Sequence, residues 1–113
     1  MMSNLPIVDD IVTGRPSEVV GTLVRKLSAY TRRDRTRKFK IGITNDPASA
    51  FSRRYARKYD EMIVLYRTRS IDSVSKLESH LVEHNWEVAD NSIGGGGGRI
   101  GDPPYYLYVV RRF

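Results

Sequence analysis

One carboxylate in the sequence stands where an acidic side chain needs a partner. Glu78 lies four residues after Val74 and four before Val82, within a segment whose apolar spacing predicts a helix over residues 70–85. This spacing places the carboxylate on the apolar face of the helix, where an unpaired charge is costly. A metal ion or a converging basic residue would offset that cost. The alternative is a glutamate at the rim of the face, bent out to solvent.

Two arginines form a second candidate group, on a helix predicted near residues 47–59. The aromatic residues of this helix recur every four positions, so they share one face, and Arg54 lies at the edge of that face. An arginine at such an edge can reach over a sheet to bind a phosphate, although many arginines in this position are only solvated. Arg53 points well away from the apolar face.

The basic charge of the chain is clustered. The 113 residues carry a net charge of +6, and residues 25–40 hold eight Lys and Arg against the single acid Asp34. A second basic cluster spans residues 53–58. Clusters of this kind are typical of proteins that bind the phosphates of nucleic acid, and the alternative is a solvated basic surface.

The lack of cysteine and of long apolar segments excludes several classes of protein. The chain has no cysteine, which excludes disulfides and cysteine–zinc sites and fits a reducing compartment. No apolar run approaches the length of a membrane span, and the first ten residues do not resemble a signal peptide. We therefore expect a soluble, cytoplasmic protein of one domain with no membrane partner.

The chain divides into alternating segments with turn signals between them. We expect an N-terminal tail over residues 1–15 and a single domain over residues 16–113. Its helices are expected at 16–30, 47–59 and 70–85, and its strands at 38–44, 61–69 and 105–113. The long loop 86–104 contains five consecutive glycines, which suit either a flexible connector or the close approach of a nucleic-acid backbone. Gly42 is unusual because it stands inside a strand, where glycine packs nothing.

One motif suggests a different chemistry. "HLVEH", residues 80–84, matches the H-x-x-E-H zinc pattern of a class of metallopeptidases. Those enzymes are large and need a further ligand far downstream, whereas only a glycine-rich loop and one strand follow here. Both histidines also fall on the polar side of the predicted helix, which argues against this interpretation.

Four segments in order resemble the GIY-YIG endonuclease superfamily, over residues 38–98. "KIGITNDP" is similar to the Y-I-G-x-T segment of the family, and "RRYARKY" to its basic helix. "KLESHLVEH" is similar to the helix with the family's glutamate, and "DNSIGGGGGR" to its late asparagine followed by glycines. The resemblance implies hydrolysis of phosphodiesters with one divalent metal, Mg²⁺ or Mn²⁺.

The resemblance also implies roles for single residues. Glu78 would bind the metal, and Arg54 would hold the scissile phosphate, with Arg53 as the second choice. Gly42 would be the glycine of the Y-I-G segment, leaving room for substrate and for neighbouring catalytic groups. Asn91 would be the supporting asparagine, and Arg99 of the same segment a substrate-binding residue.

The sequence departs from the family pattern in two ways. Lys40 stands where the family has the tyrosine of Y-I-G, and no G-I-Y strand precedes it. The C-terminal "YLYVVRR" is similar to that missing strand, with Tyr108 as its catalytic tyrosine and Tyr106 on the same face. We therefore predict a circularly permuted α+β fold: a small three-stranded, mainly antiparallel sheet flanked by three helices, with the C-terminal strand in the middle.

Three functions compete for these residues. The first is a metal-dependent endonuclease with Tyr108, Lys40, Arg54 and Glu78 as catalytic residues; its nucleic acid is expected to be DNA rather than RNA, although the sequence leaves this choice open. The second is a non-catalytic nucleic-acid-binding protein on the same scaffold. The third is a small RNA-binding module that stacks bases on Tyr105, Tyr106 and Tyr108.

Overall fold

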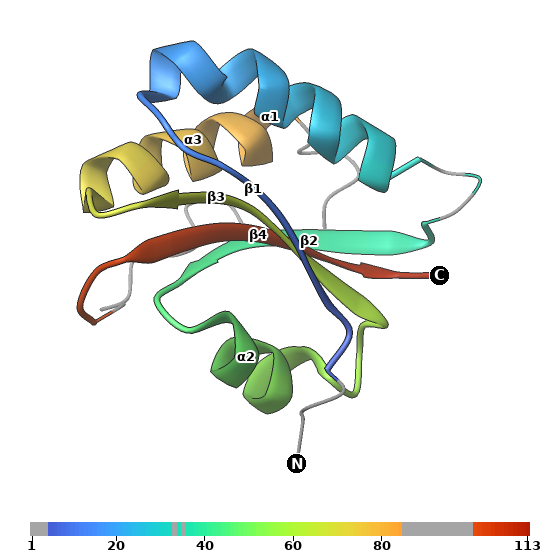
Figure 1. Cartoon of the computed structure of the whole chain (residues 1–113). Coiled ribbons are helices and arrows are strands. Elements are labelled where there is room, and N and C mark those ends of the chain that lie inside the picture. Colours follow the sequence, from blue (N-terminus) through green and yellow to red (C-terminus); the bar gives the residue numbers. More distant parts are fainter. Residues whose placement is uncertain (1–4, 33, 35, 85–100) are drawn as a thin grey trace.

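The computed structural model describes residues 5–32, 34, 36–84 and 101–113. It is an α+β fold in which a four-stranded sheet carries two helices on one face and one on the other (Figure 1). We call these the α1/α3 face and the α2 face. The elements, in chain order, are β1 (Ile7–Val12), α1 (Pro16–Tyr30), β2 (Lys38–Thr44), α2 (Pro47–Ala50), a π-helical turn η1 (Phe51–Tyr55), β3 (Glu61–Thr68), α3 (Ile71–His84) and β4 (Tyr105–Arg112).

The C-terminal strand lies inside the sheet. The strand order is β1-β3-β4-β2, and β4 pairs antiparallel with both β2 and β3. This position confirms the prediction for residues 105–113, whose β-branched and aromatic side chains suit burial on two faces. Leu107 to Val110 are all buried, with Leu107 and Tyr108 at 0% and 1% exposure.

The expected three-stranded sheet is wrong by one strand, and the expected N-terminal tail is wrong for Ile7–Val12. These residues form β1, which pairs in parallel with β3 and makes the sheet mixed. Ile7 and Ile11 pack against the core on the α2 face. The acidic pair Asp9–Asp10 interrupts the apolar pattern, and Asp10 is accommodated by a 2.6 Å ion pair with Lys26 of α1.

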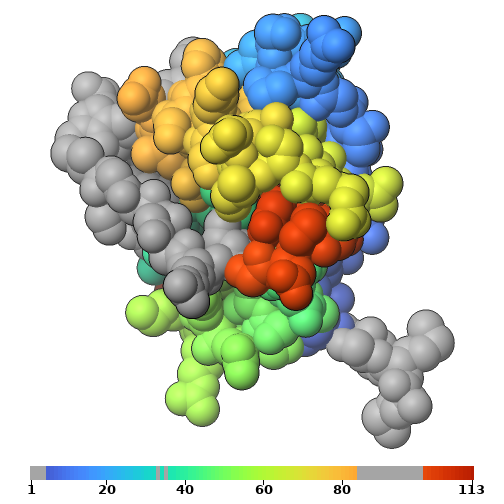
Figure 2. Space-filling model, turned by 90° about the vertical axis from the view of Figure 1, so that its left-hand side faces the viewer, coloured from blue at the N-terminus to red at the C-terminus, as the bar shows by residue number. Residues whose placement is uncertain are grey.

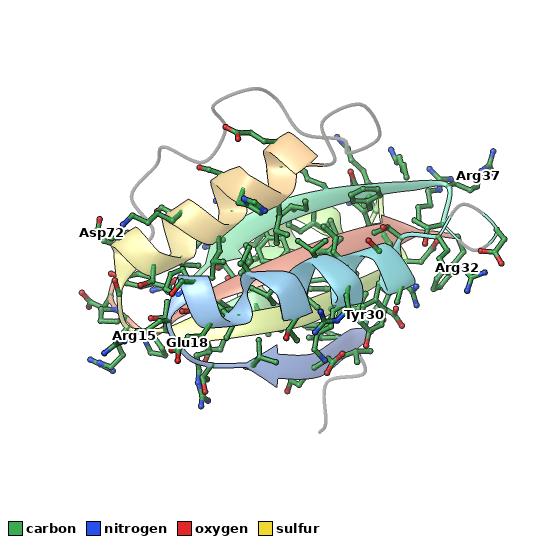
Figure 3. The ribbon with its side chains drawn as sticks, turned by 90° about the horizontal axis from the view of Figure 1, so that it is seen from above. Arg15, Glu18, Tyr30, Arg32, Arg37 and Asp72 are labelled. Atoms are coloured by element: carbon green, nitrogen blue, oxygen red, sulfur yellow. The ribbon has the colours of Figure 1, made fainter. Side chains whose placement is uncertain are left out.

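Each face of the sheet has its own hydrophobic core. On the α1/α3 face, Leu23, Leu27, Val74, Leu77 and Leu81 of the two helices pack on alternate residues of the strands. The smaller core on the α2 face gathers Phe51, Tyr55, Tyr59, Met62, Val64, Tyr108 and Val110. Seen from above, α1 and α3 lie side by side over the sheet, with Tyr30 and Arg37 at one end and Asp72 at the other (Figure 3).

The helix predicted near residues 47–59 is shorter and less regular than expected. Asp46 caps α2 by accepting a 3.2 Å hydrogen bond from the Ser49 amide, and Pro47 occupies its first turn. The chain then widens into η1, where the Ala56 amide donates to the Phe51 carbonyl. Phe51, Tyr55 and Tyr59 are nonetheless buried on one face, as the spacing predicts.

Candidate functional site

Gly42 lies directly opposite Tyr108 across β2 and β4. A Cβ atom at position 42 would lie 3.0 Å from Cε1 of Tyr108 and closer still to Cζ and the hydroxyl oxygen. Real Cβ atoms do not approach other atoms so closely. The space that Gly42 leaves at the sheet surface is therefore filled by the Tyr108 ring, a neighbouring residue of the predicted site, rather than left open for substrate.

The hydroxyl of Tyr108 is fixed by a second tyrosine, Tyr55 of η1. The two hydroxyl oxygens lie 2.6 Å apart in a buried hydrogen bond, and the rings meet edge to face with centroids 5.6 Å apart. Burial, with the hydrogen bond to Tyr55, raises the pKa of Tyr108 above its ordinary value. Tyr108 therefore stays protonated near neutral pH, which does not suit the role of general base.

Glu78 lies on α3 and is 8% exposed, on the buried face that the helical spacing predicts. No buried side-chain oxygen of the described residues lacks a partner, so the remaining exposure of Glu78 includes its carboxylate oxygens. Burial raises the pKa of its carboxyl from 4.5 to about 7, against the opposing effect of the Lys40 charge. None of the described residues gives this carboxylate a hydrogen bond or an ion pair within 4.0 Å.

Electrostatic effects link the four predicted catalytic residues, which come from four different elements. The Lys40 charge lowers the pKa of Glu78, and Glu78 in turn raises the pKa of Tyr108, which Arg54 lowers. Lys40 is partly buried on β2, two residues from Gly42, so alternation directs it to the same face as Tyr108. The helix α3 covers the other face of the sheet from Tyr108, so these electrostatic effects, and not a direct contact, link Glu78 to the other three residues. We call the four residues the Glu78–Tyr108 site.

The two arginines of η1 differ in their relation to this site. Arg53 and Arg54 are both exposed, but Arg54 is the one whose charge acts on Tyr108. The further basic residues Arg57 and Lys58, just after η1, are exposed too. The segment therefore presents several exposed positive charges, and the charge of Arg54 is the one that acts on Tyr108.

The remaining predicted residues divide between the described and undescribed parts of the chain. Tyr106 is partly buried and packs against the core of the α2 face, on the same side of the sheet as Tyr108. Asn91 and Arg99 lie outside the described residues, as does the glycine run. His80 of the "HLVEH" motif is exposed on α3, and the side chain of His84 is likewise outside the description.

The residues present fit a divalent metal through a single protein ligand. Mg²⁺ is commonly bound by one or two carboxylates, with water and substrate phosphate supplying the other oxygens. The buried, unpartnered Glu78 carboxylate provides one such ligand. Within residues 5–84 and 101–113, so far as they are described, there is no cluster of three His, Asp or Glu side chains that would enclose a metal by itself.

The Tyr55–Tyr108 hydrogen bond is the main feature of the site that the sequence argument missed. The spacing of Phe51, Tyr55 and Tyr59 put Tyr55 on the buried face, and a buried tyrosine hydroxyl normally finds a partner. That rule demands a partner for Tyr55 but does not identify it. Tyr108 lies 53 residues away in the chain and becomes its neighbour only through the sheet pairing.

The basic segment before β2 lies at one end of the molecule, where Arg32 and Arg37 are exposed (Figure 3). In the described part of the chain no helix has the length and apolar character needed to cross a membrane.

Comparisons of this chain with protein-family models, with curated proteins and with solved structures found no match.

Proposed function

We propose that this protein is a metal-dependent nuclease that hydrolyses phosphodiester bonds at the Glu78–Tyr108 site. The observation that carries the proposal is Glu78, a buried carboxylate with no hydrogen bond or ion pair to any described residue, within the electrostatic reach of Lys40. A protein that only binds nucleic acid gains nothing from a negative charge at this point, because it repels phosphate. A metal-dependent nuclease needs one.

The order of strands supports the proposal. The resemblance to GIY-YIG endonucleases required a G-I-Y strand between the 38–44 and 61–68 segments and antiparallel to both. β4 has that position, although it comes last in the chain. Its Tyr108 stands opposite Gly42, the glycine of the "KIGIT" segment.

Each residue then has a role that its chemistry allows. The Glu78 carboxylate would hold the metal, which would supply polarisation of the phosphoryl group and neutralisation of charge there. Arg54 binds the non-bridging oxygens of the scissile phosphate, and Lys40 adds a second positive charge. Because Tyr108 stays protonated, its hydroxyl positions groups by hydrogen bonding and does not remove a proton from water.

One observation favours the alternative, a non-catalytic nucleic-acid-binding protein. Tyr108 is only 1% exposed, and its hydroxyl is already engaged with Tyr55. A buried tyrosine with its hydroxyl already hydrogen-bonded can stabilise the hydrophobic core without any role in catalysis. The alternative keeps the basic surface but leaves the burial of Glu78 without a use.

A cleavage assay separates the two functions. Fluorescently labelled DNA and RNA, single- and double-stranded, are incubated with the protein in Mg²⁺, in Mn²⁺ and in excess chelator. The nuclease cleaves at least one substrate only when metal is present, and Glu78→Gln abolishes cleavage while binding in chelator is unchanged. Cleavage that survives Glu78→Gln or chelation would refute the metal role of Glu78, and binding without cleavage under all conditions would favour the alternative.

A matched series tests Arg54. Arg54→Ala is expected to reduce the cleavage rate about 100-fold, because it removes the charge that acts at the site itself. Arg57→Ala and Lys58→Ala remove the same charge from exposed positions nearby, so they should weaken binding in a salt-dependent way and leave the rate at saturation nearly unchanged. An equal loss in all three variants would mean that the helix acts only as an electrostatic surface.

A further inference from the structure

Next to the Glu78–Tyr108 site, three residues form a row across the sheet. Thr44 of β2 stands opposite Tyr106 of β4, and Tyr106 stands opposite Arg67 of β3. Tyr106 lies two residues from Tyr108, so the row faces the same side of the sheet. Packing agrees with this, because Tyr106 contacts the core of the α2 face.

Of the three tyrosines of β4, only Tyr106 offers a ring to a ligand on this face. Tyr108 is 1% exposed and covered. Tyr105 packs against the core of the opposite face, and its hydroxyl donates a 3.0 Å hydrogen bond to the Gly101 carbonyl. The Tyr106 ring is partly exposed, and neither ring stacking nor an ion holds it among the described residues.

Arg67 supplies a positive charge beside that ring. It is exposed near the end of β3, and no described residue forms an ion pair or a hydrogen bond with its guanidinium group. Figure 2 shows the orange-red segment that starts at residue 101 and leads into β4 at the surface, between α2 (green) and the start of α3 (yellow). Tyr106 and Arg67 are paired residues of neighbouring strands, and both are accessible to solvent.

We propose that Tyr106 and Arg67 form a subsite for one unpaired nucleotide, whose base stacks on the Tyr106 ring while its phosphate binds Arg67. This inference rests on the proposed function, which supplies nucleic acid as the ligand. Stacking on a side chain needs a base that has left its own stack, so the subsite favours single-stranded or locally unpaired nucleic acid over a continuous duplex. The Tyr106 ring can stack on any of the bases, so the subsite does not discriminate between sequences.

The neighbouring positions explain how such a nucleotide would be used. The Tyr106 row is the next one along the sheet from the row of Gly42 and Tyr108, on the same face. Successive side chains on one face of a strand are about 7 Å apart, close to the spacing of phosphates in an extended single strand. A nucleotide held at Tyr106 therefore places the adjoining phosphate near the row of Gly42 and Tyr108, one row from Lys40, which sets the position of the cut.

Binding measured without cleavage tests the subsite. Fluorescence anisotropy in excess chelator gives the Kd for a labelled 12-nucleotide single-stranded DNA, the RNA of the same sequence and the DNA duplex. Tyr106→Leu is expected to weaken single-strand binding by about 5- to 100-fold, the range for the loss of one stacked base, and duplex binding by less than about twofold. Tyr106→Phe keeps the ring and should bind like the wild type.

Arg67 has a matched control in Arg69, which is also exposed and lies two residues further on. Arg67→Ala should weaken binding of the single strand and reduce the slope of log Kd against log salt by about one contact. Arg69→Ala removes the same charge from outside the row and should have the smaller effect. Equal effects of the two substitutions would remove Arg67 from the subsite.

A measurement on the unaltered protein covers the case in which Tyr106→Leu fails to fold. A single-stranded DNA carrying 2-aminopurine at successive positions should change its fluorescence at the position whose base leaves its own stack for the Tyr106 ring. Absence of a change at every position, or an equal loss of single-strand and duplex binding in Tyr106→Leu, would overturn the subsite. If the wild type binds single strands but Tyr106→Leu binds equally well, the subsite is wrong and the nuclease proposal stands. If the wild type binds no nucleic acid at all, the proposed function itself fails.

Discussion

Gly42 is a residue whose size is set by one neighbour. The Tyr108 ring occupies the space where a side chain would begin, and its hydroxyl is fixed by Tyr55. Gly42→Ala should therefore displace the ring, break the hydroxyl pair and lower the free energy of unfolding by about 1–3 kcal/mol. Urea unfolding followed by circular dichroism measures the change.

Gly21 provides the control for this substitution. It is exposed in the middle of α1, and a Cβ there would meet only the Arg25 side chain, at 3.7 Å. Gly21→Ala should stabilise the protein by about 0.5–1 kcal/mol, because alanine favours the helix. If Gly42→Ala were stabilising in the same way, the close contact with Tyr108 would not exist in solution.

The raised pKa of Glu78 makes stability depend on pH. Burial raises this pKa from 4.5 to about 7, so between these values the folded protein holds a proton that the unfolded chain releases. This contribution is fully present below pH 4.5 and is lost as pH rises through about 7. The full shift would correspond to about 3 kcal/mol at pH 8, and solvent around the partly exposed carboxylate reduces this cost, so Glu78→Gln should be more stable than the wild type by about 1–2 kcal/mol. The difference in melting temperature between the two proteins, recorded from pH 4 to pH 8, follows this change.

Binding of a divalent metal should offset the loss of stability that the charged Glu78 carboxylate causes at high pH. At pH 8 a bound cation pairs with the Glu78 carboxylate, so millimolar Mg²⁺ or Mn²⁺ should raise the melting temperature of the wild type by mass action. Glu78→Gln should show no such rise, since its amide is a poor ligand for these ions. An equal rise in both proteins would assign the metal to another position, and this result does not depend on detecting cleavage.

At the scale of elements, the added strand β1 is held to α1 by a small polar network. The Asp10 carboxylate accepts hydrogen bonds from Lys26 at 2.6 Å and from the Tyr30 hydroxyl at 2.8 Å. These two contacts lower the pKa of Asp10 below its ordinary value. Tyr30 lies at the C-terminal end of α1 (Figure 3), and its carbonyl accepts a 2.8 Å hydrogen bond from Arg111 of β4.

Asp10→Asn should weaken this attachment. We expect a loss of about 1–2 kcal/mol in the free energy of unfolding, since the hydrogen bonds to a charged carboxylate go but the pair is partly exposed to solvent. Asp9→Asn makes the same change at the adjacent exposed position and should alter stability by less than about 0.5 kcal/mol. Hydrogen exchange should show the loss of protection first in the β1 amides. An equal loss of stability in Asp10→Asn and Asp9→Asn would argue against a specific attachment of β1 to α1 through Asp10.

The elements also show what the sequence could predict. Helices α1 and α3 have a clear period of 3.6 residues, β2 alternates with a period of two, and β3 and β4 are continuous apolar runs. The predicted bounds of these five elements agree with the structure to within one residue. β1 was missed because Asp9 and Asp10 break its pattern, and because the partner that stabilises it lies more than 50 residues away. The π-helical turn was missed because a widened turn leaves the same aromatic residues buried and so has no separate signal.

The same division applies to the site. Glu78 could be predicted because helical spacing alone decides which face a residue occupies. The Tyr55–Tyr108 bond and the contact of Tyr108 with Gly42 could not, because they depend on the register of two strands. Register is a property of the assembled sheet, in which a shift of one residue would turn Tyr108 to the other face.

At the scale of the whole molecule, the two ends of the described chain lie close together in the sheet. Ile7 of β1, Met62 of β3 and Val110 of β4 stand in one row. Two strand spacings separate the first from the last, about 10 Å. Four extended residues span about 13 Å, so residues 1–4 are long enough to join Phe113 to Leu5 if the ends are fused.

A circular permutant tests whether the order of elements matters. Phe113 is joined to Met1, and the chain is opened between Gly96 and Gly97, so that β4 now comes first. Every strand pairing is kept, and one long connection is exchanged for a short one, so the free energy of unfolding should stay within about 2 kcal/mol of that of the natural order. A chain that simply ends at Gly101 lacks the central strand, which separates β2 from β3, and should not fold.

The permutant also bears on the proposed function, because it brings the chain order closer to the one that the resemblance implies. The Glu78–Tyr108 site draws on β2, η1, α3 and β4, none of which is cut. If the site works through geometry alone, the permutant should cleave the same substrates as the natural order, at a rate within about threefold. A permutant that folds, as judged by its melting curve, but binds and does not cleave would locate an essential group in the connection between α3 and β4. That result would direct attention to Asn91 and Arg99, the two predicted site residues on that connection.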